Sequence, residues 1–90
     1  MNLSQLYYFR KLAEVKHYTH AAEELFISQP TLSNSISQLE RELGIPLFER
    51  EGRKIKLTKY GEEFYQYATE AVNALEKGIA LAEELAEVLG

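Results

Sequence analysis

The sequence predicts an all-α, mainly helical domain that carries one small two-stranded sheet. Apolar residues recur at helical spacing over most of the chain, and its 90 residues include only five glycines and two prolines. Residues 47–57 instead alternate polar and apolar side chains around a glycine, which is typical of a β-hairpin. We therefore expect one domain over residues 1–58, followed by a long helix over residues 59–90.

The first helix is expected over residues 3–16. Its apolar residues recur three or four positions apart: Leu3, Leu6, Phe9 and Ala13. Asn2 and Gln5 have the spacing of a reciprocal N-terminal cap, in which each side chain binds the backbone N–H of the other residue. The second helix is short, over residues 20–25, and Thr19 is a suitable N-cap for it.

A three-residue turn, residues 26–28, leads into the third helix. Ser28 is a good N-cap, and Pro30 fits the first turn because the N–H that proline lacks has no partner there. Gly44 ends the helix because glycine readily adopts the left-handed conformation of a C-cap, and Pro46 follows shortly after. Two helices joined by so tight a turn form a helix-turn-helix.

The third helix has two different faces. Four apolar residues share one narrow arc: Leu32, Ile36, Leu39 and Leu43. The remaining surface carries Pro30, Ser33, Asn34, Ser37 and Arg41, with Gln38 at its edge and Gln29 and Thr31 at the N-terminal end. Serine and asparagine disfavour helix, so this face is a poor choice for a merely solvated surface, which is the alternative. Short polar side chains on a helix are suited to base edges in a DNA major groove.

The segment after Gly44 predicts a hairpin and a last helix. Residues 47–50 and 54–57 form two strands around a turn that contains Gly52. Thr58 is then placed to cap a helix over residues 59–89. The order of elements is that of a winged helix-turn-helix followed by a long helix.

The distribution of charge favours binding to nucleic acid, although the net charge is −4. Residues 1–60 hold nine Lys and Arg against seven Glu, whereas residues 61–90 hold one Lys and seven Glu. Residues 50–59 alone hold five basic side chains and one acid. Because local potential decides the attraction of phosphates, we expect double-stranded DNA as a partner. A short solvated basic loop is the alternative for this segment.

The last helix predicts a second partner, another copy of the chain. Nine residues alternate four and three positions apart: Tyr60, Phe64, Tyr67, Ala71, Ala74, Gly78, Leu81, Leu85 and Val88. This heptad stripe runs along a rod about 46 Å long, too long for a domain of 58 residues to bury. We expect a homodimer, and the alternative is that the helix folds back on its own domain. A dimer implies a two-fold related DNA site.

Other classes of function find little support in the residues. The chain has no Cys and no Asp, and His17 and His20 lack the further ligands of a zinc site. There is no glycine-rich phosphate loop and no pairing of a nucleophile with a base, so we expect no enzyme, cofactor or metal. No apolar run approaches a membrane span and no signal segment is visible, which predicts a cytoplasmic location near the nucleoid.

The sequence resembles the N-terminal domain of LysR-type transcriptional regulators. The resemblance rests on FxxxAExxxxTxAAExLxxSQPTLSxxIxxLExELGxPLFER, from Phe9 to Arg50, and on GRxIxLTxxG, which ends at Gly61. It implies a DNA-binding winged helix and an antiparallel pair of linker helices. It also implies that a small-molecule effector binds only through a further domain outside this chain, and that full-length relatives form tetramers.

The polar helix face, the basic hairpin and the resemblance together give the candidate DNA contacts: Thr19, His20, Gln29, Pro30, Thr31, Ser33, Asn34, Ser37, Gln38, Arg50, Arg53 and Lys54. Asn34 stands where the family often has Arg, and asparagine pairs with adenine whereas arginine pairs with guanine. Arg53 matches the wing arginine of the family and would enter a minor groove. Arg50 has a structural alternative, an ion pair with Glu49 or Glu51. A winged helix that binds protein rather than DNA is the alternative for the whole chain.

Overall fold

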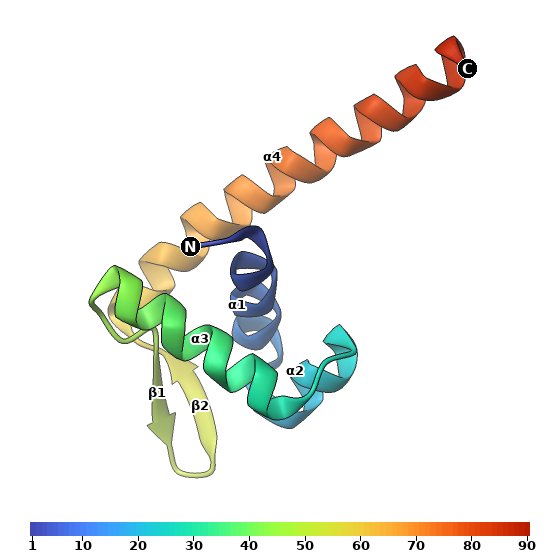
Figure 1. Ribbon diagram of the computed structural model, residues 1–90. Coiled ribbons are helices and arrows are strands. Elements are labelled where there is room, and N and C mark those ends of the chain that lie inside the picture. Colours follow the sequence, from blue (N-terminus) through green and yellow to red (C-terminus); the bar gives the residue numbers. More distant parts are fainter.

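The computed structural model describes all residues, 1–90, as four helices and one two-stranded sheet. The elements are α1 (Leu3–Val15), α2 (Tyr18–Leu25), α3 (Gln29–Leu43), β1 (Phe48–Glu51), β2 (Lys54–Leu57) and α4 (Lys59–Leu89). The first three helices pack together, and the hairpin and the far end of α4 extend from this body to opposite ends of the molecule (Figure 1). The molecule measures 53 × 25 × 19 Å. The predicted fold class, a winged helix-turn-helix with a long C-terminal helix, is confirmed.

Most predicted helix ends are confirmed by their hydrogen bonds. Asn2 and Gln5 form the reciprocal cap of α1, with N···O distances of 2.9 and 3.1 Å. The side chain of Ser28 accepts a hydrogen bond from the N–H of Thr31 at the start of α3. Gly44 ends α3 at a φ of 76°, a left-handed value that favours glycine.

The predicted start of α2 is wrong. The helix begins at Tyr18 rather than at residue 20, and its N-cap is His17, not Thr19. The backbone of His17 is extended, so its ring nitrogen Nδ1 reaches the N–H of His20 at 3.2 Å. An imidazole acceptor thus satisfies a free N–H of the first turn, which is the role expected of the Thr19 hydroxyl. Thr19 lies exposed within that first turn.

The core is formed by one side of each helix together with the hairpin. Its largest fully buried side chains are Phe9, Leu12, Leu32, Ile36, Leu39, Leu47 and Val72. The Phe9 ring lies at the centre, 5.5 Å from the Phe48 ring and 5.3 Å from the Phe64 ring between centroids. Aromatic rings at this separation and tilt attract one another. The core therefore joins α1 both to the hairpin and to α4.

The first part of α4 belongs to this core, which the heptad pattern did not predict. Gly61, Ala68 and Val72 are buried, and Phe64 packs against Phe9 instead of lying on the free stripe. At Gly61 the helix backbone approaches so closely that a Cβ there would overlap the Leu47 carbonyl oxygen. The first part of α4 is therefore packed against the body as far as Val72. From residue 73 onward every residue is exposed.

Candidate nucleic-acid interface

The polar face of α3 is free, as its sequence predicts. Leu32, Ile36 and Leu39 are buried and hold the helix against the body. Asn34 and Ser37 are exposed on the surface away from them, as are the remaining polar residues predicted there, except that Ser33 is half-buried. Its short polar side chains have the chemistry that suits hydrogen bonding to base edges.

Hydrogen bonds order the N-terminal end of this face. The Gln29 amide donates to Ser33 Oγ at 2.9 Å, and the hydroxyls of Ser28 and Thr31 lie 2.7 Å apart. In each pair, the two residues are about one helical turn apart at the start of α3. The side chains are held in one arrangement before any ligand arrives, which lowers the entropic cost of binding.

The two acids of the hairpin are paired with a lysine of the opposite strand. Lys56 lies opposite Glu49 in the antiparallel register. Its Nζ is 2.9 Å from a Glu51 carboxylate oxygen and 3.5 Å from a Glu49 oxygen. The hydrogen bond from Lys56 lowers the pKa of Glu51, and the same bond raises the pKa of Lys56. Lys56 therefore partners both acids of the hairpin, and the alternative ion pair of Arg50 with either acid does not form.

A basic cleft of about 230 Å³ lies between the body and the hairpin. It is lined by Lys16, His17, Tyr18, Thr19, Gln29, Arg50, Arg53 and Ile55. Lys16, Arg50 and Arg53 are exposed and form no ion pair. Three free cations beside the first residue of α3 form a site for an anionic group. We call it the basic cleft below.

Sequence reasoning missed Lys16 and His17 as members of this site. They belong to the corner between α1 and α2, far along the chain from Arg50 and Arg53, and only the folded body brings them together. The one available signal was the run of basic and polar residues from Lys16 to His20. The His17 and His20 rings are stacked, with centroids 4.2 Å apart, so His20 is held at the same corner.

Tyr18 forms part of the inner wall of the basic cleft. Burial is the main cause that raises the pKa of its hydroxyl, and the charge of Glu40 raises it further, while Arg50 acts in the opposite direction. The phenol therefore remains a neutral group, and it adds no negative charge to a site for anions.

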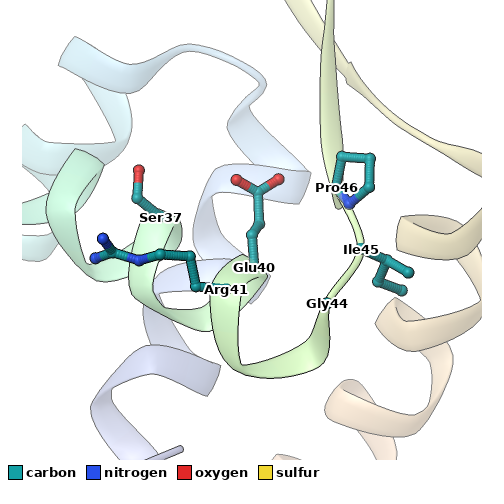
Figure 2. Close-up of a pocket in the computed structure, with 6 residues that line it drawn as sticks. All are labelled: Ser37, Glu40, Arg41, Gly44, Ile45 and Pro46. Atoms are coloured by element: carbon teal, nitrogen blue, oxygen red, sulfur yellow. The ribbon is translucent and has the colours of Figure 1, made fainter.

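Glu40, on α3, fastens the hairpin to that helix. One of its carboxylate oxygens accepts hydrogen bonds from the N–H of Leu47 at 2.6 Å and of Phe48 at 3.2 Å. Glu40 lies in a second, open cleft of about 460 Å³ with Ser37, Arg41, Gly44, Ile45 and Pro46 (Figure 2). Because α3 holds the first strand in this way, the wing and the polar face of α3 keep a fixed relation to each other.

The predicted dimer stripe is mostly exposed. Apart from Phe64, all its members lie open: Tyr60, Tyr67, Ala71, Ala74, Gly78, Leu81, Leu85 and Val88. Leu75, Ile79 and Leu89 are exposed as well and widen it. A continuous apolar surface of this extent is unusual on a monomer. No helix combines the length and the apolar composition that a membrane crossing requires, and no cluster of three potential metal ligands is present.

Comparison with known proteins identifies the family. The sequence profile described as "Bacterial regulatory helix-turn-helix protein, lysR family" matches residues 3–62. The chain is 53% identical over 64 residues, 71% of its length, to the uncharacterized HTH-type transcriptional regulator YybE of Bacillus subtilis. It is 41% identical over 88 residues, 98% of its length, to the HTH-type transcriptional regulator BenM of Acinetobacter baylyi. The matched segments span 22% and 29% of these two relatives.

The fold agrees with a solved structure of the same family. The crystal structure of the BenM DNA-binding domain in complex with its catB site 1 DNA superposes with a TM-score of 0.90 at 41% identity. The superposition covers 96% of this chain and 97% of that one, so α4 is included along with the winged helix. The sequence profile, the relatives and the fold agree: the chain belongs to the lysR family of bacterial regulatory helix-turn-helix proteins.

Proposed function

We propose that this chain binds a two-fold related DNA site as a homodimer, with α3 in the major groove and the wing in the adjacent minor groove. The observation that carries the proposal is the exposed, hydrogen-bonded polar face of α3 beside the basic cleft. The BenM domain, of nearly the same length and fold, forms a complex with DNA. The chain is then the DNA-reading part of a transcriptional regulator that acts in the cytoplasm.

Phosphates are expected to bind at the basic cleft. In the proposed complex, the sugar-phosphate strand at the edge of the major groove passes the basic cleft, whose lining includes Lys16, His17 and Arg50. Pro30 has no N–H and Thr31 donates its own to Ser28, so the first turn of α3 offers the Gln29 N–H and the positive end of the helix dipole to the same phosphates. Arg53, at the tip, is free to enter a minor groove, where narrow A/T-rich sequence gives the most negative potential.

Base contacts are assigned to the middle of the polar face. Asn34 is exposed and its amide can pair with the N6 and N7 atoms of adenine. The hydroxyl of Thr31 is engaged with Ser28, so its methyl group is left to meet a thymine methyl. Ser37 and Gln38 follow along the groove. This arrangement supports a preference for A/T base pairs beneath α3.

The dimer is assigned to the exposed stripe of α4. Gly78 lies inside a helix, where glycine is about 1 kcal/mol less favourable than alanine, and nothing in its own chain lies within 4 Å of a Cβ placed there. No contact within the chain explains this cost, whereas a close crossing of two helices does. The small side chains of Ala71 and Ala74 lie on the same stripe and likewise allow a second helix to approach closely.

Salt dependence separates DNA reading from protein binding. A dimer that displaces counterions from several phosphates loses affinity steeply as salt rises, with a slope of several units in log K against log salt. A protein-binding winged helix gives a flat dependence and no preference among DNA sequences. We would measure both with the purified chain and a DNA pool selected by that chain.

The matched variants are Ser33→Glu and Ser4→Glu. Both add one carboxylate to a helix, but Ser33 lies on the polar face of α3 and Ser4 lies exposed on α1. Ser33→Glu should abolish the preference for the selected sequence because it places a negative charge against bases and phosphates. Ser4→Glu should keep it. Retention of sequence preference in Ser33→Glu would rule out α3 as the reader.

Sedimentation tests the dimer independently of DNA. Leu85→Glu places a charge on the exposed stripe, and Ala80→Glu places one on the side of α4 that already carries Glu83, Glu84 and Glu87. We expect Leu85→Glu to sediment as a monomer and Ala80→Glu as a dimer. An unchanged dimer mass for Leu85→Glu would exclude this stripe as the interface.

A further inference from the structure

Beyond Val72, two polar contacts join the body to α4, and both come from Arg10. Val72 is the last buried residue of α4. One guanidinium nitrogen of Arg10, on α1, lies 3.2 Å from a Glu76 carboxylate oxygen, and another lies 3.4 Å from the Asn73 side-chain oxygen. The contact therefore spans the place where α4 leaves the body.

Arg10 is itself held in position by α1. Its guanidinium carbon lies 5.4 Å from the centre of the Tyr7 ring, and Nε lies 3.9 Å from a Glu14 carboxylate oxygen. Tyr7 and Glu14 flank Arg10 one turn before and one turn after it, so the side chain is oriented from both sides. Only 23% of the Arg10 side chain is exposed. The guanidinium is a fixed point on the body against which α4 is aligned.

We propose that Arg10, with Asn73 and Glu76, sets the angle between α4 and the DNA-reading body, and thereby the half-site spacing that the dimer accepts. This inference rests on the proposed homodimer. About 26 Å of helix follow Val72, so a tilt of roughly 10° moves the far end by about 4–5 Å. In an antiparallel pair the partner's body lies near that end. The movement exceeds the rise of one base pair, about 3.4 Å.

An ion pair at the surface, here partly exposed on the Arg10 side and about half exposed on the Glu76 side, contributes little to global stability, so its removal should leave the fold intact. Its expected effect is on the distribution of angles at which α4 leaves the body. Arg10 is accordingly a positioning residue, and the readout that identifies it is a change in spacing preference. A phosphate contact by Arg10 would instead lower the salt slope of DNA binding by about one unit at every spacing.

The test uses Arg10→Met and Glu76→Ala, which remove the contact from either side. Glu76 is about half exposed, and alanine is the best helix former, so Glu76→Ala retains the fold. Lys11→Met is the matched control, because it removes the same charge from the neighbouring position, whose partners Glu14 and Glu24 lie on α1 and α2. Each variant is challenged with duplexes that carry two inverted half-sites at spacings varied by single base pairs.

We expect the wild type and Lys11→Met to prefer one spacing. Arg10→Met and Glu76→Ala should lose roughly threefold in discrimination against neighbouring spacings, as expected for one exposed ion pair, with dimer mass and salt slope unchanged. If the Arg10→Met and Glu76→Ala variants are dimers and still prefer one half-site spacing as strongly as the wild type, this inference is wrong while the proposed dimer stands. A monomeric wild type would overturn the proposed dimer and this inference with it.

Discussion

At the scale of single residues, Asn34 bears most directly on the base preference of the proposed complex. The resemblance implies a position often held by Arg, and the structure leaves the Asn34 side chain exposed on the polar face of α3. In the proposed complex, an amide at this position presents a base with a different pattern of donors and acceptors from that of a guanidinium. The departure bears on which base pair is preferred, because an exposed side chain contributes little to the fold.

Asn34→Arg should shift the preferred base at one position of each half-site from adenine to guanine. A bidentate pair discriminates by about 1–3 kcal/mol, so selection from a random DNA pool will resolve the change. Asn34→Ala is the control and should relax that position without choosing a new base. If Asn34→Arg keeps the adenine, another residue reads that position.

The raised pKa of Tyr18 predicts that the protein loses stability at alkaline pH. Burial first, and the charge of Glu40 second, raise the pKa of its hydroxyl above the usual value. Above about pH 10 the unfolded chain loses this proton while the folded chain retains it, so the folded state binds more protons and its stability falls as pH rises. Tyr18→Phe should make the decline shallower in urea titrations between pH 9 and about 11.

The exposed residue Tyr67 provides the control for this pH dependence. Tyr67→Phe also removes a tyrosine hydroxyl, but one outside the core, so the stability of this variant should decline at alkaline pH as steeply as that of the wild type. Equal slopes for Tyr18→Phe and the wild type would show that the environment of Tyr18 does not govern this part of the curve. Both variants keep an aromatic ring, so packing changes little.

At the scale of elements, local chemistry made helix ends predictable and tertiary contacts limited the rest. Ser28 and Gly44 act within one turn of themselves, and each behaves as the sequence predicts. The start of α2 was predicted wrongly because His17 is a rare cap, whose function depends on an extended backbone and on ring orientation. The inward side of α4 was missed because the prominent heptad stripe concealed a second set of small residues, including Gly61 and Ala68.

Thr58→Ala should destabilise the junction between the wing and α4. The Thr58 hydroxyl accepts from the N–H of Gly61 at 3.0 Å and donates to the Pro46 carbonyl at 2.7 Å. Both bonds are at least partly buried, so we expect a loss of about 1–3 kcal/mol in the free energy of unfolding. Thr58→Ser retains the hydroxyl and should lose less in the same urea titration. Equal losses would assign the effect to the methyl group.

At the scale of the whole molecule, the candidate site could be predicted from the sequence only in part. The polar face of α3 follows from helical periodicity, and the wing from its glycine and its alternation. The basic cleft combines residues from the α1–α2 corner, α3 and the hairpin, and no periodicity links them. The contact of Arg10 with α4 likewise joins residues more than 60 positions apart.

The molecule also divides its charge along its length. The basic side chains gather at the cleft and the wing, while seven of the acids follow residue 60 on α4. Figure 1 shows the wing and the far end of α4 at opposite ends of the molecule. The cleft and the wing of each chain therefore attract a duplex while the acidic α4 does not, which favours encounters that bring DNA to the basic surfaces. Because exposed charges are screened beyond about 8 Å at physiological salt, this effect acts on the rate of association more than on the final affinity.

Dimerisation should matter to DNA binding through effective concentration rather than through new contacts. Once one body is bound to its half-site, α4 holds the second body close to the other half-site, and such linkage raises overall affinity by a factor of about 10²–10⁴. Leu85→Glu should therefore weaken binding to a two-half-site duplex by at least about 10²-fold and leave the affinity of one body for a single half-site unchanged. Ala80→Glu should behave as the wild type on both duplexes. Fluorescence anisotropy with the two duplexes measures both affinities. If Leu85→Glu weakens binding to the single half-site by the same factor, α4 supports the DNA-reading surface itself rather than only joining two copies of it.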